Sequence, residues 1–143
     1  MNFIDLGLPS GTKWADANYG SNTPYEYGKL YSFSDAKKLS CKLPTHRQLS
    51  ELTFYCKVKW ISKNGINGCE FVGPNNNSIF LPASGRIEVS GLAMGQGNNG
   101  FYWSNENGGV NPSSMAWNMM ICEDWQTDGC QDIRRKHSVR PIQ

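Results

Sequence analysis

Residues 138–143, Ser-Val-Arg-Pro-Ile-Gln (SVRPIQ), end the chain with alternating apolar and polar side chains. Such alternation is typical of a β-strand, in which successive side chains point to opposite faces. Val139 and Ile142 are both apolar, although a regular strand places them on opposite faces. Pro141 has no N–H to donate, which restricts it to a sheet edge or to the last pairing of a strand. We therefore predict a strand over 138–142 that anchors the scaffold.

The composition indicates one folded domain over 1–143. A chain of 143 residues, 38% of them hydrophobic, is long enough to bury a core, and 15 Gly with 7 Pro predict many turns. The net charge is +2 and no run of Lys and Arg exceeds 134–136, so nothing indicates a nucleic-acid partner. No stretch has the roughly 18 apolar residues of a membrane span, and Met1 is not followed by a signal-peptide pattern. We expect no direct membrane insertion and no signal peptide in this chain.

The strongest helix signal begins at Thr45. Gln48 lies three residues later, which is the spacing of a capping box, and Leu49 and Leu52 follow on one helical face. This pattern predicts a helix over 46–55. A second, short helix is expected over 35–39, where Ser34 is the candidate cap.

Many short strands are expected around these helices. Two of them flank the turn Leu8-Pro9-Ser10-Gly11 within 3–18, because Pro and Gly suit turn dihedrals. Asn64-Gly65 between alternating runs predicts a hairpin. The predicted strands beyond 3–18 are 58–61, 69–72, 78–82, 86–90, 100–104, 116–121 and 138–142. Short strands with few helices predict an α+β fold with twisted antiparallel sheet.

Chemistry that needs a cofactor has little support in the sequence. His46 and His137 are the only histidines, and neither has a neighbouring Ser or Cys in a recognisable nucleophile motif. No oxygen-rich cluster matches a calcium site, and no grouped Cys and His match a zinc site. We expect no catalytic residue, no metal and no cofactor. Of the five cysteines, Cys122 and Cys130 leave two interpretations open, namely free thiols or a disulfide.

Six stretches in order along residues 5–142 carry a family resemblance: DLGLPSGTKWADAN, EYGKLYSF, LPTHRQLSEL, NGINGCEFVGPNNNSIFLPASG, GFYWSNEN and SVRPI. Together they resemble a paralogous domain abundant in gut Bacteroidetes and their phages. That family is similar to the C-type-lectin fold, in the branch that includes formylglycine-generating enzymes. Some members are variable proteins of diversity-generating retroelements, in which a C-terminal segment is rewritten to make new ligand-binding surfaces.

The resemblance implies a C-type-lectin-like domain in which the two chain ends pair, with 3–6 lying near 138–142. It implies a location on a cell surface or virion and a ligand-binding, variable segment over 105–137. The enzyme branch uses a cysteine pair for copper-dependent oxidation, and Cys122 with Cys130 lie in the corresponding half. The calcium-binding motifs of related lectins are absent, which puts metal-dependent sugar binding in doubt. Randomised Asn codons cannot give Met120 or Trp125, so protein sequence alone does not show that this gene is diversified.

The segment 105–137 is polar and contains two Trp. Within WNMMIC, alternation predicts that Trp117, Met119 and Ile121 face the core and that Asn118, Met120 and Cys122 face outward. The predicted ligand-binding residues are Asn105, Asn107, Ser113, Ser114, Asn118, Met120, Glu123, Asp124, Trp125, Gln126, Thr127, Asp128 and Asp132.

Three functions follow, and the first is preferred. The chain is a non-catalytic domain that binds a surface protein or glycan, with Trp125 as an aromatic anchor. Alternatively it is a passive structural module of a larger surface or virion protein. For the segment itself two further interpretations stay open: 122–137 is a solvated loop, or Trp125 folds back as a local plug. The third alternative is a formylglycine-generating type of oxidase.

Overall fold

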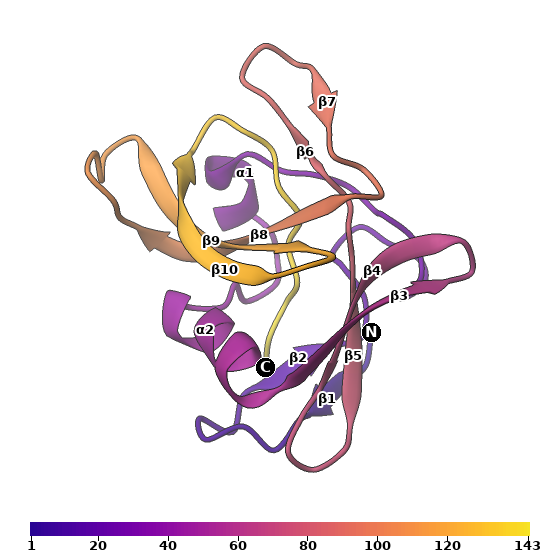
Figure 1. Ribbon diagram of the computed structural model, residues 1–143. Helices are drawn as coiled ribbons and strands as arrows, with labels where there is room; N and C mark the ends of the chain where they lie inside the picture. The colour runs from indigo at the N-terminus through magenta and orange to yellow at the C-terminus, as the bar shows by residue number, and fades with distance from the viewer.

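The computed structural model describes all residues 1–143 and consists mostly of antiparallel β-sheet with two short helices (Figure 1). Two sheets have three strands each, and two ribbons have two strands each. The α+β class predicted from the sequence is therefore confirmed. Neither helix has the length and apolar character that a membrane-crossing helix requires.

The helix α2, His46–Tyr55, forms where the capping box predicts it. The Thr45 hydroxyl accepts from the Gln48 amide at 3.1 Å, and the Gln48 side chain accepts from the Thr45 amide at 2.8 Å. These two bonds satisfy amides that the first helical turn leaves free. Leu49 and Leu52 are fully buried, so this face of α2 fixes the helix to the core.

The short helix α1, Phe33–Lys37, begins two residues before the predicted one. Its cap is Ser32 and not Ser34, because the Ser32 hydroxyl accepts from the Asp35 amide at 3.3 Å. The early start buries Phe33, whose ring contacts Trp103 edge-on at 5.4 Å. Tertiary packing of Phe33 therefore favours the earlier of two possible serine caps.

The sheet of β3 (Lys57–Lys63), β4 (Ile66–Val72) and β5 (Ser78–Pro82) confirms the predicted hairpin. Asn64 and Gly65 have φ of 53° and 78°, the left-handed conformation that a two-residue hairpin turn requires. Beside this sheet, β1 (Phe3–Asp5) pairs with β2 (Lys13–Ala15), and Gly11 N donates to Leu8 O at 3.0 Å in the predicted turn.

The second sheet comprises β8 (Asn99–Asn107), β9 (Met115–Cys122) and β10 (Gln126–Asp132). The alternative that 122–137 is a solvated loop is wrong, because β10 pairs with β9 over seven consecutive residues. The two strands of the remaining ribbon, β6 (Arg86–Ile87) and β7 (Ala93–Met94), form a projecting hairpin at the top of Figure 1. The predicted strand over 86–90 is reduced to β6.

The chain end is anchored, but its pairing differs from the predicted one. Ile142 bridges Trp14 and Lys42, and Ser138 bridges Tyr102, so 138–142 is held by isolated bridges and not by one continuous strand. Its neighbour is β2 and not residues 3–6, since Ala15 N donates to Pro141 O at 3.0 Å. The strand β2 therefore lies between β1 and the chain end, which places the C-terminus close to β2 in Figure 1.

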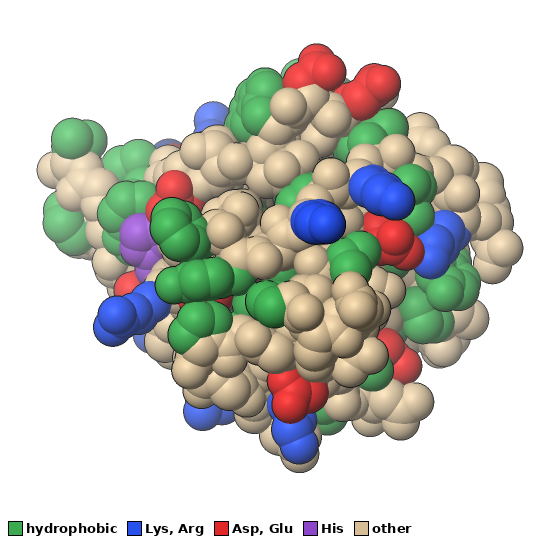
Figure 2. Space-filling model, turned by 60° about the horizontal axis from the view of Figure 1, so that its bottom comes forward, with side chains coloured by type: hydrophobic (Ala, Val, Ile, Leu, Met, Phe, Trp, Pro, Cys, Tyr) green, Lys and Arg blue, Asp and Glu red, His purple; other side chains and the backbone are tan.

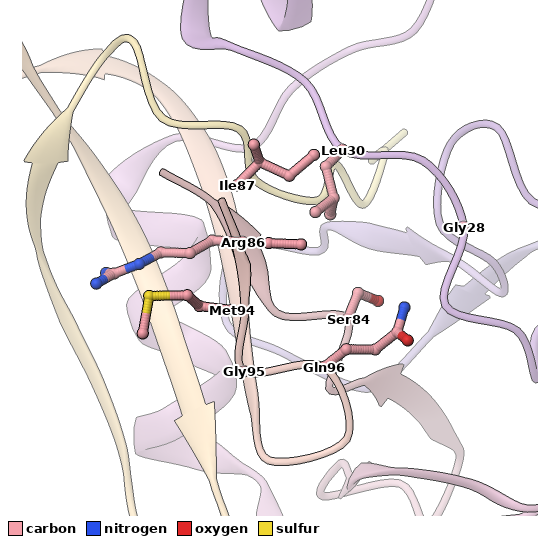
Figure 3. Close-up of a pocket in the computed structure, with 9 residues that line it drawn as sticks. Gly28, Leu30, Ser84, Arg86, Ile87, Met94, Gly95 and Gln96 are labelled. Carbon is pink, nitrogen blue, oxygen red and sulfur yellow. The ribbon is translucent and has the colours of Figure 1, made fainter. Parts of the chain in front are cut away.

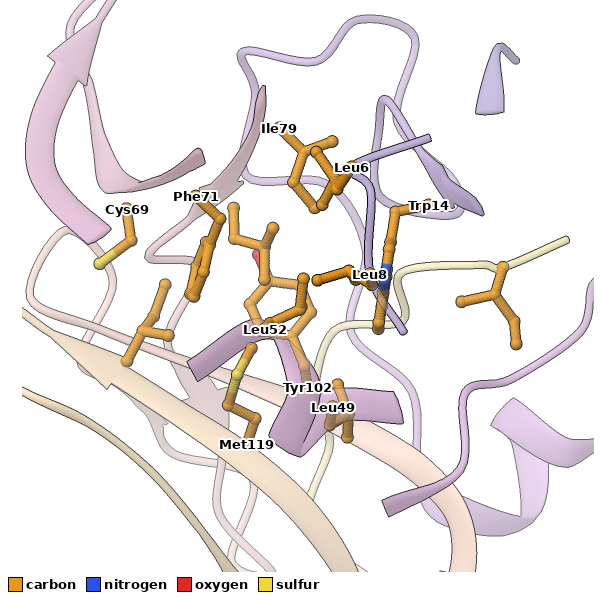
Figure 4. Packing of buried hydrophobic residues seen from close by; sticks show 13 residues of the cluster. Leu6, Leu8, Trp14, Leu49, Leu52, Cys69, Phe71, Ile79, Tyr102 and Met119 are labelled. Atoms are coloured by element: carbon orange, nitrogen blue, oxygen red, sulfur yellow. The ribbon is translucent and has the colours of Figure 1, made fainter. Parts of the chain in front are cut away.

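The main core lies between the two larger sheets and α2. Figure 4 shows Leu49 and Leu52 of α2 beside Met119 of β9, with Tyr102 near the centre of the cluster. Arg140 is 1% exposed and donates to Ala15 O at 3.0 Å, Phe80 O at 2.6 Å and Asn18 Oδ1 at 2.9 Å. Ser138 N also donates to Phe101 O of β8 at 2.8 Å, so the terminal segment joins β2, β5 and β8 by hydrogen bonds.

Candidate functional site

The predicted binding residues lie on a sheet with two different faces. In the register of β9 and β10, Met119 is opposite Asp128 and Met120 is opposite Thr127. Two residues that are opposite each other point to the same face of the sheet, and successive residues of a strand point to opposite faces. The two pairs therefore lie on different faces. The helix face, which carries Met119 and Asp128, packs on α2 and the main core. The outer face carries Met120 and Thr127.

On the helix face, α2 holds Asp128 in place. The imidazole of His46 stacks on Trp117 with ring centroids 3.8 Å apart and planes 7° apart, and its Nε2 contacts Asp128 Oδ2. The Ser50 hydroxyl lies 3.4 Å from the same carboxylate oxygen. The hydrogen bond with His46 is the main reason why the pKa of Asp128 is below its ordinary value. Asp128 therefore fixes the sheet to α2, although its side chain remains partly exposed.

This group of Ser, His and Asp does not have the geometry of a nucleophile with its base. The Ser50 hydroxyl bonds to Asp128 and to the backbone carbonyl of His46, and not to the imidazole. A serine nucleophile requires a base that accepts its proton. The arrangement therefore gives Ser50 no activating imidazole.

Asn118 is not the outward-facing contact residue that alternation predicted. It is 1% exposed, and its Nδ2 donates to Gly129 O at 2.9 Å while its Oδ1 is buried without a partner. Asn118 does lie on the outer face, opposite Trp103 of β8. The imidazole of His137 stacks on Trp103 at 4.0 Å and covers this part of the face. Strand alternation gave the side correctly but could not show that the chain end returns over it.

The outer face is uncovered at the β9–β10 turn, where Cys122 N donates to Trp125 O at 3.0 Å. This bond makes Cys122 and Trp125 the pair that flanks a two-residue turn of Glu123 and Asp124. We call the residues at this end of the outer face the apical patch: Met120, Cys122, Glu123, Asp124, Trp125 and Thr127. Trp125 is 46% exposed and belongs neither to the main core nor to the smaller cluster around Phe33, Trp103 and Val139.

Gln126 lies beside this turn but points to the helix face. Its Nε2 is 3.8 Å from the sulfur of the buried Cys69, whose S–H in turn points to Cys122 O at 3.8 Å. These contacts join the base of the β9–β10 turn to β4. Gln126 therefore supports the apical patch from below and does not belong to its surface.

The remaining predicted contact residues lie at the opposite end of the sheet. Asn107, Ser113 and Ser114 are exposed in and around the β8–β9 loop. The strand β9 runs from that loop to the turn of the apical patch, and its eight residues span roughly 24 Å at about 3.4 Å per residue. Two hydrogen bonds from the Arg134 side chain to Asp132 help to lower the pKa of that carboxyl to about 2. Asn105 is half-buried, so the predicted residues do not form one continuous surface.

The five cysteines are free thiols, and the disulfide between Cys122 and Cys130 is excluded. In the β9–β10 register Cys130 is opposite Trp117, five residues from Cys122 along β9. Five residues span roughly 17 Å at about 3.4 Å per residue, whereas the Cα atoms of a disulfide lie within about 7 Å. The same separation prevents these two thiols from sharing a copper ion.

Several exposed apolar residues were not found by sequence reasoning. Phe54 and Tyr55 end α2 with exposed fractions of 79% and 46%, and Val110 in the β8–β9 loop is 95% exposed. Leu92 and Met94 are exposed on the β6–β7 hairpin. Helical periodicity separated the buried Leu face of α2 from the rest, but no sequence signal distinguished these residues from core residues.

A cavity of about 320 Å³ lies beside the β6–β7 hairpin. Figure 3 shows Arg86 extending away from Ser84 and Gln96, so the polar groups do not converge on one point. The Ser84 hydroxyl is already bonded to Tyr27 O at 2.6 Å, and Arg86 to Glu88 at 2.6 Å. This cavity is therefore a weaker candidate than the apical patch.

Charge does not distinguish a binding surface on the face that Figure 2 shows. Figure 2 shows acidic and basic side chains interspersed on one face, with hydrophobic side chains gathered around a histidine at its left. No group of three or more His, Cys, Asp or Glu side chains lies close enough together to hold a metal ion.

Comparison with protein families, curated proteins and solved structures gives no match for this chain.

Proposed function

We propose that this protein is a non-catalytic ligand-binding domain with a C-type-lectin-like fold, and that the apical patch is its binding surface. The fold proposal is supported by the antiparallel sheets, the two short helices and the chain end that joins the N-terminal ribbon at β2. The sequence resemblance to variable proteins of retroelements supports the same fold and a surface location. The ligand is a protein or glycan on another surface.

The single observation that carries the proposal is the environment of Trp125. Trp125 lies at a hairpin tip, is 46% exposed and is not part of a buried hydrophobic cluster. Its large apolar ring is costly to leave in water, and buried aromatic side chains are typical anchors of binding sites. Glu123 and Asp124 beside it are exposed and supply hydrogen-bond acceptors at the rim.

The rest of the hairpin supports this role because it is rigidly held. Met119 and Ile121 are fully buried, and His46 with Ser50 holds Asp128 from α2. An ordered hairpin loses less conformational entropy when a ligand binds to its tip. The apical patch therefore combines an exposed anchor with a scaffold that keeps it in place.

The proposal is tested by probing arrays of glycans and of purified surface proteins with wild-type protein and two variants. Trp125→Ala should lower affinity for any ligand found by about 30-fold or more, which corresponds to about 2 kcal/mol. Phe54→Ala is the matched control, because Phe54 is an even more exposed aromatic residue outside the apical patch. Unchanged affinity in Trp125→Ala, or an equal loss in Phe54→Ala, would contradict the proposal.

A further inference from the structure

The strands β3 and β10 are both outermost strands of their sheets. In contrast, the free side of β8 is occupied, because Trp103 N donates to Ser138 O at 3.1 Å and Ser138 N donates to Phe101 O at 2.8 Å. The two outermost strands are each seven residues long. An outermost strand presents a row of unpaired backbone groups that can pair with another chain.

The free backbone groups of β10 follow from its pairing with β9. Hydrogen bonds from Cys122 N to Trp125 O and from Ile133 N to Ser114 O fix the odd-numbered residues as the inward-bonded ones. The N–H groups of Gln126, Asp128, Cys130 and Asp132 therefore point away from the sheet, and no other backbone group accepts from them. Thr127 and Asp128 are exposed, and the pairing with β9 has no bulge that would twist this edge away.

The free backbone groups of β3 follow in the same way. Lys63 and Ile66 flank the two-residue turn, and such flanking residues form a hydrogen-bonded pair. Alternation then directs the N–H groups of Val58, Trp60 and Ser62 outward. Ser62 is exposed, and no other backbone group occupies this edge.

The two edges carry opposite charges. Lys57, Lys59 and Lys63 lie on β3, which has no acidic residue, whereas Asp128 and Asp132 lie on β10, which has no basic residue. Lys63 is already paired with Glu70 and Asp132 with Arg134, which leaves Lys57 and Lys59 on β3 and Asp128 on β10 for a contact between copies. Lysines on an outermost strand disfavour pairing with an identical strand, because like charges repel. Lys57 and Lys59 favour pairing with an edge that carries a carboxylate, and the partly exposed Asp128 provides one on β10.

We propose that a second copy of this chain binds here, with β3 of one copy adding to β10 of the next. The contact is head-to-tail, so each copy uses a different edge and keeps the other one free for a further copy. Only two strands meet, so the interface is small and the association depends on concentration. This self-association goes beyond the proposed ligand binding and does not rest on it.

The test uses two proline variants, each of which blocks one edge. Cys130→Pro removes an outward N–H from β10, and Ser62→Pro removes one from β3; proline is tolerated at such edge positions. The matched controls Cys130→Ala and Ser62→Ala keep the N–H groups. Circular dichroism and thermal melting establish that each variant is folded before sedimentation velocity is measured.

Wild-type protein and both alanine controls should form increasing oligomers up to about 1 mM. Each proline variant alone should sediment as a monomer, because association requires a free β3 edge and a free β10 edge and each variant has one of them blocked. An equimolar mixture of the two should give a complex of two chains that does not grow, since one variant supplies β3 and the other β10. Monomeric wild-type protein together with a monomeric mixture would overturn the proposal, and so would dimers of either proline variant alone.

If one proline variant fails to fold, charge reversal tests the same contact without altering the backbone. Lys57→Glu combined with Lys59→Glu should weaken association of the chain, and so should raising the salt concentration from about 0.05 M to 0.5 M. Association that is unchanged by both treatments would overturn the proposed pairing of oppositely charged edges.

Discussion

The terminal segment 137–143 and the β9–β10 hairpin belong to the same part of the sequence but are held very differently. From His137 to Ile142 every residue is buried, and the segment bonds to β2, β5 and β8. In the hairpin, Met119 and Ile121 are fully buried whereas Glu123, Asp124 and Trp125 are exposed. The comparison teaches that the end of the chain stabilises the fold, while the hairpin stabilises it with one face and leaves its tip free for contacts.

Removing the terminal segment should have the largest effect. A chain truncated after Lys136 loses the buried side chains of Val139 and Ile142, each worth about 1.5–3 kcal/mol. It also leaves the acceptors of Arg140 unpaired, at about 1–3 kcal/mol for each buried group. Against a total stability of roughly 5–15 kcal/mol, we expect cooperative unfolding to disappear in calorimetry. A truncated chain with an unchanged melting temperature would show that the segment is not an anchor.

Within the hairpin, the neighbouring residues Met119 and Met120 should contribute very differently to the free energy of unfolding. Met119→Ala should cost about 2–5 kcal/mol of unfolding free energy, because Met119 is fully buried and its removal leaves a cavity. Met120→Ala, on the half-buried outer face, should cost clearly less. Asn118→Ala should cost about 0.5–1.5 kcal/mol, since it removes the hydrogen bond from Asn118 Nδ2 to Gly129 O. Denaturant titrations compare the three, and equal costs for the two methionines would contradict the two-face arrangement.

Lowering the pH should reduce the stability of the folded protein, because His137 in the terminal segment is buried. Burial lowers the pKa of His137 well below its ordinary value, and the charges of Arg86 and Arg135 lower it further. The folded protein therefore holds the neutral imidazole, so this contribution to stability is complete above about pH 6.5, the ordinary pKa of histidine. Below that pH it is lost at about 1.4 kcal/mol per pH unit, until the folded-state pKa is reached.

Urea unfolding at several pH values from about 7.5 to 5 measures this loss, and His137→Phe is the matched variant. A phenyl ring keeps a flat group between Phe101 and Trp103 but does not titrate. The wild-type protein should lose more stability on acidification than the variant. Identical pH profiles would contradict the assignment of a neutral, buried imidazole.

Local signals in the sequence predicted the parts of the fold that depend on neighbouring residues. The capping box of Thr45 and Gln48 located α2, and Asn64-Gly65 located the β3–β4 hairpin, because both rest on hydrogen bonds or dihedrals within a few residues. The strand β10 was missed because its sequence, QTDGCQD, has no apolar alternation. Its pairing depends on β9 and on contacts with α2, which no local pattern reveals.

The site was predicted only in part for the same reason. Trp125 was found because a large aromatic residue in a polar stretch stands out, and its exposure agrees with that expectation. Asn118 lies on the predicted side but is buried, beside Trp103, on which His137 stacks from nineteen residues further along the chain than Asn118. The division of the remaining residues between two ends of the sheet required the strand register.

The unfolding free energy of Trp125→Ala tests the central claim most directly, because it needs no ligand. If the apical patch is a contact surface on a scaffold that does not depend on it, the substitution should change stability by no more than about 0.5 kcal/mol, as for surface positions without a structural role. Thr127→Ala, at an exposed neighbour in the patch, should behave in the same way. A loss of about 2 kcal/mol or more in Trp125→Ala would instead make Trp125 a structural plug, and the proposed binding surface would lose its anchor.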